Sequence, residues 1–173
     1  MFGFIRKKRA ISAAVLVTQP LINTLTYQHD LPERFWNDPY ALGYLATMMG
    51  FAIDAVGRDH PLTDNQRAEA LATTFAKISG SDGWLMMTRI ELYIEHEHPE
   101  LEEGKRSARK VLTSCYGLGD QSKDSDVARA AYSVMRADTG LPEDNIAGAL
   151  IDDLFTNRMK ARFFPVSGRN VPF

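Results

Sequence analysis

A stretch of fourteen residues without a charged side chain, 40–53, constrains the fold of this chain more than any other feature. Asp38 and Pro39 precede it, which is the order of a helix N-cap and a proline at the first helical position, and apolar residues recur at helical spacing as far as Gly57. A helix with no charged face must be buried on most sides, and a membrane span needs about 20 apolar residues. We therefore predict a buried core helix.

Helix start and stop signals recur along the rest of the chain. Thr63 and Gln66 fit a capping box, Asp82 can cap a following helix, and Pro99 can end one helix and open the next. Apolar side chains recur every three or four positions within each segment, which is the helical period. The predicted helices span residues 38–57, 63–80, 82–98, 99–117, 124–140 and 142–159. In 82–98 we expect the inward-facing residues to be Trp84, Met87, Ile90, Tyr93 and Ile94.

The sequence of residues 14–17 is compatible with two secondary structures, a strand and a helix. The run Ala-Val-Leu-Val is compatible with a short strand. Against this, one helical face holds Ile11, Val15, Ile22 and Leu25. Pro20 would then either kink that helix or start a second one.

Three glycines, Gly43, Gly50 and Gly57, recur every seven residues along the core helix. Glycine inside a helix costs about 1 kcal/mol relative to alanine, so its repeated use indicates close approach of another helix or a ligand. We expect close helix packing within the chain.

Composition supports a single helical domain. The chain has 173 residues, of which 45% are hydrophobic and 24% charged, and these values are usual for a globular protein. We predict an all-α bundle of roughly six to eight helices with short loops, as one domain over 1–173 with a basic-aromatic segment at 1–10 and a tail at 164–173. A single cysteine, Cys115, excludes an internal disulfide and agrees with a reducing compartment, so we expect a cytoplasmic location.

No motif in the chain specifies a chemistry. Glu95 and His98 have the Glu-x-x-His spacing of di-metal helical bundles, but such a site needs a second copy of the motif, and neither His29 nor His60 follows a glutamate by three residues. Cys115 has no base near it in sequence and is expected to be buried. We therefore predict no catalytic residues, no metal and no cofactor, and we do not expect an enzyme.

Charge is divided unevenly along the chain, whose formal net charge is −2. Residues 11–157 hold all 22 acidic and 12 of the 20 basic side chains, a net charge of −10, whereas the ends 1–10 and 158–173 hold four bases each. Bases beside aromatic rings suit an acidic protein surface or an anionic membrane, while an acidic body repels nucleic acid. The predicted partner-binding residues are Phe2, Phe4, Arg6, Lys7, Lys8, Arg9, Arg162, Phe163 and Phe164.

These features predict a non-catalytic, all-helical protein-interaction or regulatory module that forms an oligomer or joins an assembly. A protein partner or self-association is the first expectation. A peripheral membrane protein that uses the basic-aromatic N-terminus is the alternative, and a helical metalloenzyme with the Glu-x-x-His site is the second alternative.

Overall fold

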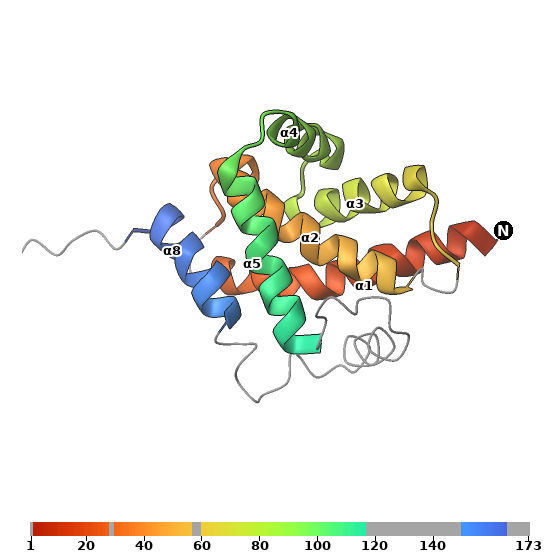
Figure 1. Ribbon diagram of the computed structural model, residues 1–173, viewed down its shortest axis with the longest axis horizontal. Coiled ribbons are helices and arrows are strands. Elements are labelled where there is room, and N and C mark those ends of the chain that lie inside the picture. Colours follow the sequence, from red (N-terminus) through yellow and green to blue (C-terminus); the bar gives the residue numbers. More distant parts are fainter. Residues whose placement is uncertain (1, 28–29, 57–59, 117–149, 166–173) are drawn as a thin grey trace, which may run out of the picture.

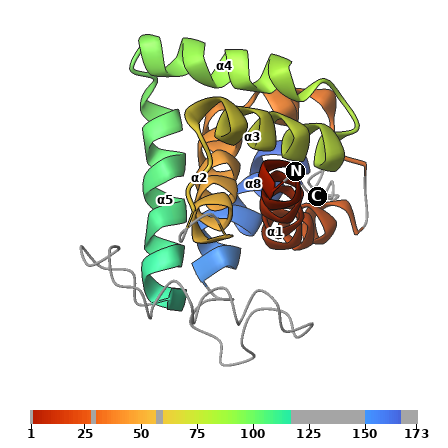
Figure 2. The same cartoon turned by 90° about the vertical axis from the view of Figure 1, so that its right-hand side faces the viewer.

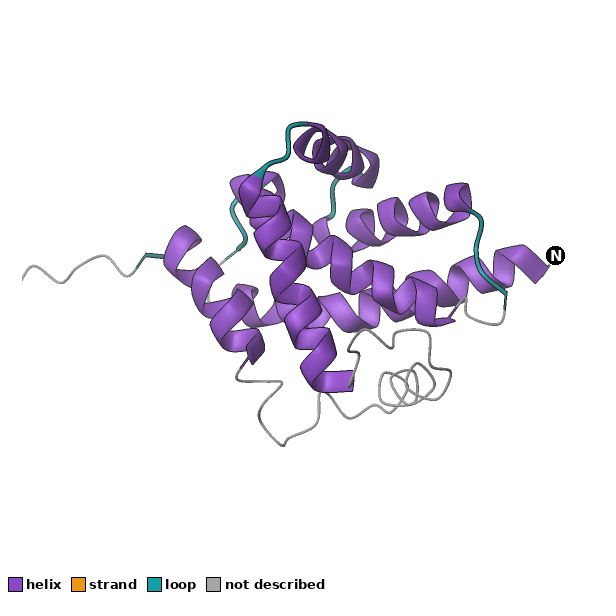
Figure 3. Ribbon diagram, viewed as in Figure 1, coloured by secondary structure: helices purple, strands orange, loops and turns teal. Residues whose placement is uncertain are grey.

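The computed structural model describes residues 2–27, 30–56, 60–116 and 150–165, and over these residues the chain is helical without a strand (Figure 3). The predicted all-α bundle is thereby confirmed. The predicted helix 124–140 lies outside the described residues. The elements are α1 (Phe2–Thr26), the 3-10 helix η1 (Glu33–Asn37), α2 (Pro39–Val56), α3 (Asp64–Ser79), α4 (Gly83–Glu95), α5 (Pro99–Tyr116), the π-helical turn η2 (Asp152–Thr156) and α8 (Asn157–Phe163).

Helix α2 lies at the centre of the bundle and packs against α5, α1 and α3 (Figure 1). The side chain of Asp38 caps it by accepting a hydrogen bond from the backbone N–H of Ala41 at 2.9 Å. Tyr40, Leu45 and Met49 are fully buried. Burial of each such side chain contributes roughly 1.5–3 kcal/mol, so the predicted core helix supplies a large part of the apolar stabilisation.

Two glycines bring the backbones of α2 and α5 into contact. A Cβ atom on Gly43 would overlap the carbonyl oxygen of Leu101, and a Cβ atom on Gly104 would overlap that of Tyr40. The close helix approach predicted within the chain is therefore confirmed at Gly43. Gly57, the last of the three evenly spaced glycines, lies outside the described residues.

Residues 14–17 are helical and lie inside α1, so the helix is the correct one of the two structures that the sequence left open. Pro20 also lies within α1 and neither ends it nor starts another helix. Proline removes the hydrogen bond to the carbonyl four residues earlier, which is that of Leu16. Both Leu16 and Pro20 are exposed, so water can reach this carbonyl.

The caps at both ends of α3 and at the start of α4 are those that the sequence predicts. The Thr63 hydroxyl accepts from the N–H of Gln66 at 3.3 Å, and the Gln66 side chain accepts from the N–H of Thr63 at 3.1 Å. Gly80 closes α3 with a φ of 70°, which is the left-handed region. The Asp82 carboxylate then accepts from the N–H of Trp84 at 2.9 Å and starts α4.

Helix α4 ends at Glu95, three residues earlier than the sequence predicts. The N–H of His98 bonds to the carbonyl of Tyr93 at 2.8 Å, and the N–H of Glu97 bonds to that of Ile94 at 3.0 Å. Glu97 has a φ of 48°, so these residues form a Schellman motif with a left-handed turn. The His98 ring packs edge-on to Tyr93 with centroids 5.1 Å apart. The left-handed turn therefore takes His98 off the helix.

Residues 150–163 form one helix that contains the π turn η2, in which the N–H of Asn157 bonds to the carbonyl of Asp152. The Tyr40 hydroxyl of α2 donates a hydrogen bond to the carbonyl of Leu154 inside this turn. The described part of the predicted helix 142–159 is confirmed, and the helix continues to residue 163. Its buried residues are Ile151, Phe155, Thr156, Met159 and Phe163.

The change Gly43→Ala should lower the free energy of unfolding by about 1–3 kcal/mol, because the added methyl group forces the α2 and α5 backbones apart and the helix-propensity gain offsets only part of that cost. Gly50 on the same helix is the matched control, since a Cβ atom there would lie 2.9 Å from the movable end of the Arg67 side chain. Gly50→Ala should change stability by less than about 1 kcal/mol. Urea unfolding measures both, and equal stabilities would contradict the backbone contact.

Candidate functional site

The N-terminal members of the predicted partner-binding set lie in the first turns of α1. The Nζ atom of Lys7 is 2.6 Å from Oε2 of Glu69 on α3, so this charge is paired within the chain. Lys8 and Arg9 are exposed. The remaining members are the half-buried Arg6 and, outside the described side chains, Phe2 and Phe4.

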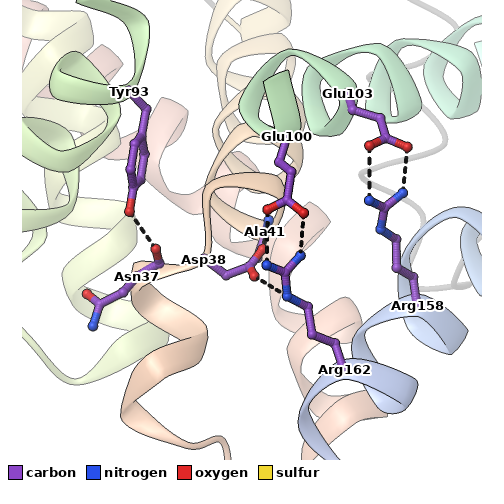
Figure 4. Close-up of polar contacts among 8 residues, drawn as sticks. All are labelled: Asn37, Asp38, Ala41, Tyr93, Glu100, Glu103, Arg158 and Arg162. Carbon is purple, nitrogen blue, oxygen red and sulfur yellow. Dashed lines mark hydrogen bonds and ion pairs between the residues drawn. The ribbon is translucent and has the colours of Figure 1, made fainter. Parts of the chain in front are cut away.

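Arg162 of α8 is bound by two carboxylates of its own chain (Figure 4). Its guanidinium forms a two-pronged ion pair with Glu100 of α5, with N–O distances of 3.1 and 3.0 Å, and its Nε lies 2.7 Å from Oδ2 of Asp38. Burial raises the pKa of the Asp38 carboxyl, and the hydrogen bond from Ala41 and the Arg162 charge oppose this only in part. Hydrogen bonds from Arg162 lower the pKa of Glu100. The Arg162 charge is thus used inside the fold.

Arg158, one turn earlier on α8, makes a second link of the same kind. Its guanidinium pairs with Glu103 at 2.6 and 3.0 Å (Figure 4). Its Cζ lies 3.9 Å from the centroid of the Tyr40 ring. Glu100 and Glu103 are three residues apart on α5, and Arg158 and Arg162 are four apart on α8, so each pair occupies one helix face. The two links hold α8 against α5 and the start of α2.

The aromatic residues predicted at the C-terminal end also serve the fold. Phe163 is buried with its ring edge-on to Phe35 at 5.5 Å, and Phe164 is half-buried against the core. Helix α8 and the N-terminus lie at opposite ends of the longest axis (Figure 1). Among the described residues the two basic ends therefore do not form one patch, and the bases of the predicted set that stay exposed without a carboxylate partner are Lys8 and Arg9.

Residues that the sequence places in the core lie on the outside of α4. Trp84 is 53% exposed and Ile94 49% exposed, so the expectation that both face inward is wrong. Ile90 is buried as expected, and Met87 and Tyr93 are partly buried.

Gly83 determines which side of α4 is buried. A Cβ atom on Gly83 would overlap the carbonyl oxygen of Ala72, so the glycine side of α4 must be the side that contacts α3. The inner side is also held by Tyr93, whose hydroxyl donates to the carbonyl of Asn37 at 2.8 Å (Figure 4). Trp84 follows Gly83 directly and is therefore turned toward solvent. A glycine directly after an N-cap is the sequence signal, but its meaning depends on the neighbouring helix.

We define the outer face of α4 as the exposed residues on the side opposite Gly83. Steps of three and four residues place them on one stripe. Helix α4 lies across α3 at the edge of the bundle (Figure 2), and the residues of this stripe are exposed. The stripe combines apolar and acidic groups, and its residues are Trp84, Leu85, Thr88, Glu91, Leu92 and Glu95.

The Glu-x-x-His pair does not form a helical metal site. Helix α4 ends at Glu95, and His98 lies beyond the left-handed turn with its ring against Tyr93. In the described part of the chain no three His, Cys, Asp or Glu side chains are arranged to hold a metal ion. No helix within the described ranges has the length and apolar character to cross a membrane.

The change Glu103→Gln should lower the free energy of unfolding by about 0.5–1 kcal/mol at neutral pH, since ion pairs with partly exposed groups are weak. Hydrogen bonds from Arg158 lower the folded-state pKa of Glu103 below its ordinary 4.5. The pair therefore stabilises the fold above pH 4.5, and that contribution is lost as the pH falls through the folded-state pKa. In urea unfolding the deficit of Glu103→Gln should therefore be smaller at about pH 3 than at neutral pH.

Glu91→Gln, which changes an exposed carboxylate of α4, is the control and should match the wild type at both pH values. A deficit of Glu103→Gln that stays constant at low pH would mean that the carboxylate charge does not hold α8.

Comparison of the chain with protein-family models, with curated proteins and with solved structures finds no match.

Proposed function

We propose that this protein is a non-catalytic, all-helical interaction module that binds a protein partner through the outer face of α4. The observation that carries the proposal is the exposure of Trp84, Leu85 and Leu92 on one stripe of a well-anchored helix. Adjacent exposed apolar side chains are typical of interaction sites, because their burial contributes about 25 cal/mol per Å².

Trp84 is the strongest binding group on this face. Tryptophan is enriched among the residues that dominate interface energies, since its ring buries a large area and its N–H can still donate. Leu92 lies two turns further along the same stripe. The two side chains are therefore spaced to fit two adjacent pockets or one partner helix.

The outer face of α4 is held in a fixed position in the unbound chain. Gly83 contacts the α3 backbone, and two hydrogen bonds tie the inner side of α4 to η1. These are the Tyr93 bond and a bond at 3.2 Å from Arg89 to the carbonyl of Trp36. A rigid surface loses little conformational freedom on binding, which favours affinity.

The carboxylates of the outer face define the chemistry of the partner. Glu91 and Glu95 are exposed, and neither pairs with a base among the described residues. Apolar groups beside two unpaired carboxylates favour a surface that presents apolar and basic side chains together. A nucleic acid would not satisfy this requirement.

The change Leu92→Ser should reduce the partner captured with the tagged full-length chain from its native cells by at least about tenfold, because an apolar contact at the interface is lost. Trp84→Ser should have the same effect. Quantitative mass spectrometry of the captured proteins measures the loss.

Ile94→Ser is the matched control, since Ile94 and Leu92 are 49% and 47% exposed on the same helix but Ile94 lies outside the outer face. It should leave capture unchanged, and thermal unfolding should show that all three variants fold. Equal losses for Leu92→Ser and Ile94→Ser, or no captured protein, would refute the proposed function.

A further inference from the structure

We infer that the partner of the outer face of α4 is a second copy of this chain, which presents the outer face of α1; this inference rests on the proposed function. Helix α1 carries an exposed stripe along its first half, which we call the outer face of α1. Its residues are Ile5, Lys8, Arg9, Ser12 and Leu16.

The outer face of α1 combines apolar ends with a basic middle. Ile5 is 46% exposed and Leu16 is 50% exposed. Lys8 and Arg9 lie between them, and neither pairs with a carboxylate in the part of the chain that the structure describes. This face has the apolar and basic groups that the outer face of α4 requires.

The two faces have the same length. The α1 face extends from residue 5 to residue 16 and the α4 face from residue 84 to residue 95, so each covers eleven helical steps. At 1.5 Å per residue both stripes are about 17 Å long. One can therefore cover the other from end to end.

An antiparallel arrangement matches the groups of the two faces. With Leu16 placed beside Trp84, Arg9 comes beside Glu91, Lys8 beside residue 92 and Ile5 beside residue 95. Leu16 thus meets an apolar ring and Arg9 meets a carboxylate. Lys8 lies one position from Glu91, and Ile5 lies one helical turn from Leu92.

A parallel arrangement does not match them. With residue 5 beside residue 84, the two bases would lie beside Met87 and Thr88, and neither would meet a carboxylate. The pairing of Arg9 with Glu91 therefore favours the antiparallel arrangement.

The two faces of one copy cannot meet. Helix α3 packs against both α1 and α4 and lies between them (Figures 1 and 2). The contact must therefore join α1 of one copy to α4 of another. In a pair joined in this way, the α4 face of the first copy and the α1 face of the second copy remain unpaired. Such a head-to-tail contact closes into a ring or continues as a filament.

Sedimentation velocity of the full-length chain tests this inference. The weight-average mass should rise between about 1 and about 200 µM, because a single helix pair is at the small end of protein interfaces. Lys8→Glu with Arg9→Glu should weaken association at least about tenfold, and so should Glu91→Lys with Glu95→Lys. All four changes in one chain should restore association to within about threefold of wild type.

These changes keep the helices favourable, because acidic groups near the start of α1 and basic groups near the end of α4 suit the helix dipole. Circular dichroism should confirm that each variant folds. Lys77→Glu changes an exposed base of α3 outside both faces and should leave association unchanged.

Mixing two variants tests the head-to-tail geometry. Leu16→Ser disables the α1 face and Trp84→Ser disables the α4 face, so each variant alone should stay monomeric at concentrations where the wild type associates. Their equimolar mixture should form a dimer that does not grow, because each copy contributes one intact face.

A wild-type chain that stays monomeric, association that none of these changes weakens, or failure of the folded four-residue variant to associate would overturn the inference. Binding of the monomer to anionic vesicles through Lys8 and Arg9, in place of association, would overturn it as well. The proposed function has a separate test. Capture of a different protein that depends on Leu92 would agree with the proposed function and contradict self-association. The absence of any captured protein would refute both the proposed function and self-association.

Discussion

The backbone contact between α2 and α5 is the constraint on which the rest of the structure depends. Because Gly43 and Gly104 remove the side chains that would separate these helices, Tyr40 on α2 and Glu103 on α5 lie close enough to share one partner. Arg158 is that partner, since its guanidinium covers the ring and pairs with the carboxylate. A wider helix spacing would offer Arg158 only one of its two contacts, and α8 would lose its position on the bundle.

The starts of α3 and α4 were predictable because their capping signals are local. The capping box at Thr63 and Gln66 and the cap at Asp82 act within four residues of the chain. The orientation of α4 was not predictable in this way, because the helical period alone assigns Trp84 to the core. The side of α4 that is buried depends on the contact of Gly83 with another helix, and the glycine alone does not identify that helix.

The candidate site was predictable only in part, for the same physical reason. The bases at the two ends are alike in sequence, yet Arg158 and Arg162 pair with carboxylates more than fifty residues away, while Lys8 and Arg9 stay exposed. Ion pairs between distant segments leave no local pattern except matching spacings on two helices. The charges of Arg158 and Arg162 therefore contribute to the fold, whereas Lys8 and Arg9 have no carboxylate partner among the described residues.

The π turn η2 sets the rotational phase of the C-terminal helix. In a regular α-helix four residues rotate about the axis by roughly 40° more than a full turn. Residues spaced four apart would therefore be displaced around the helix by about 120° over three such steps. Ile151, Phe155, Met159 and Phe163 are nevertheless all buried. The wider turn, with its hydrogen bond to the carbonyl five residues earlier, takes up part of this drift. The number of residues in this turn therefore determines how α8 is rotated about its own axis. Removing one residue would shorten the chain by one position and would rotate both arginines of α8 away from α5.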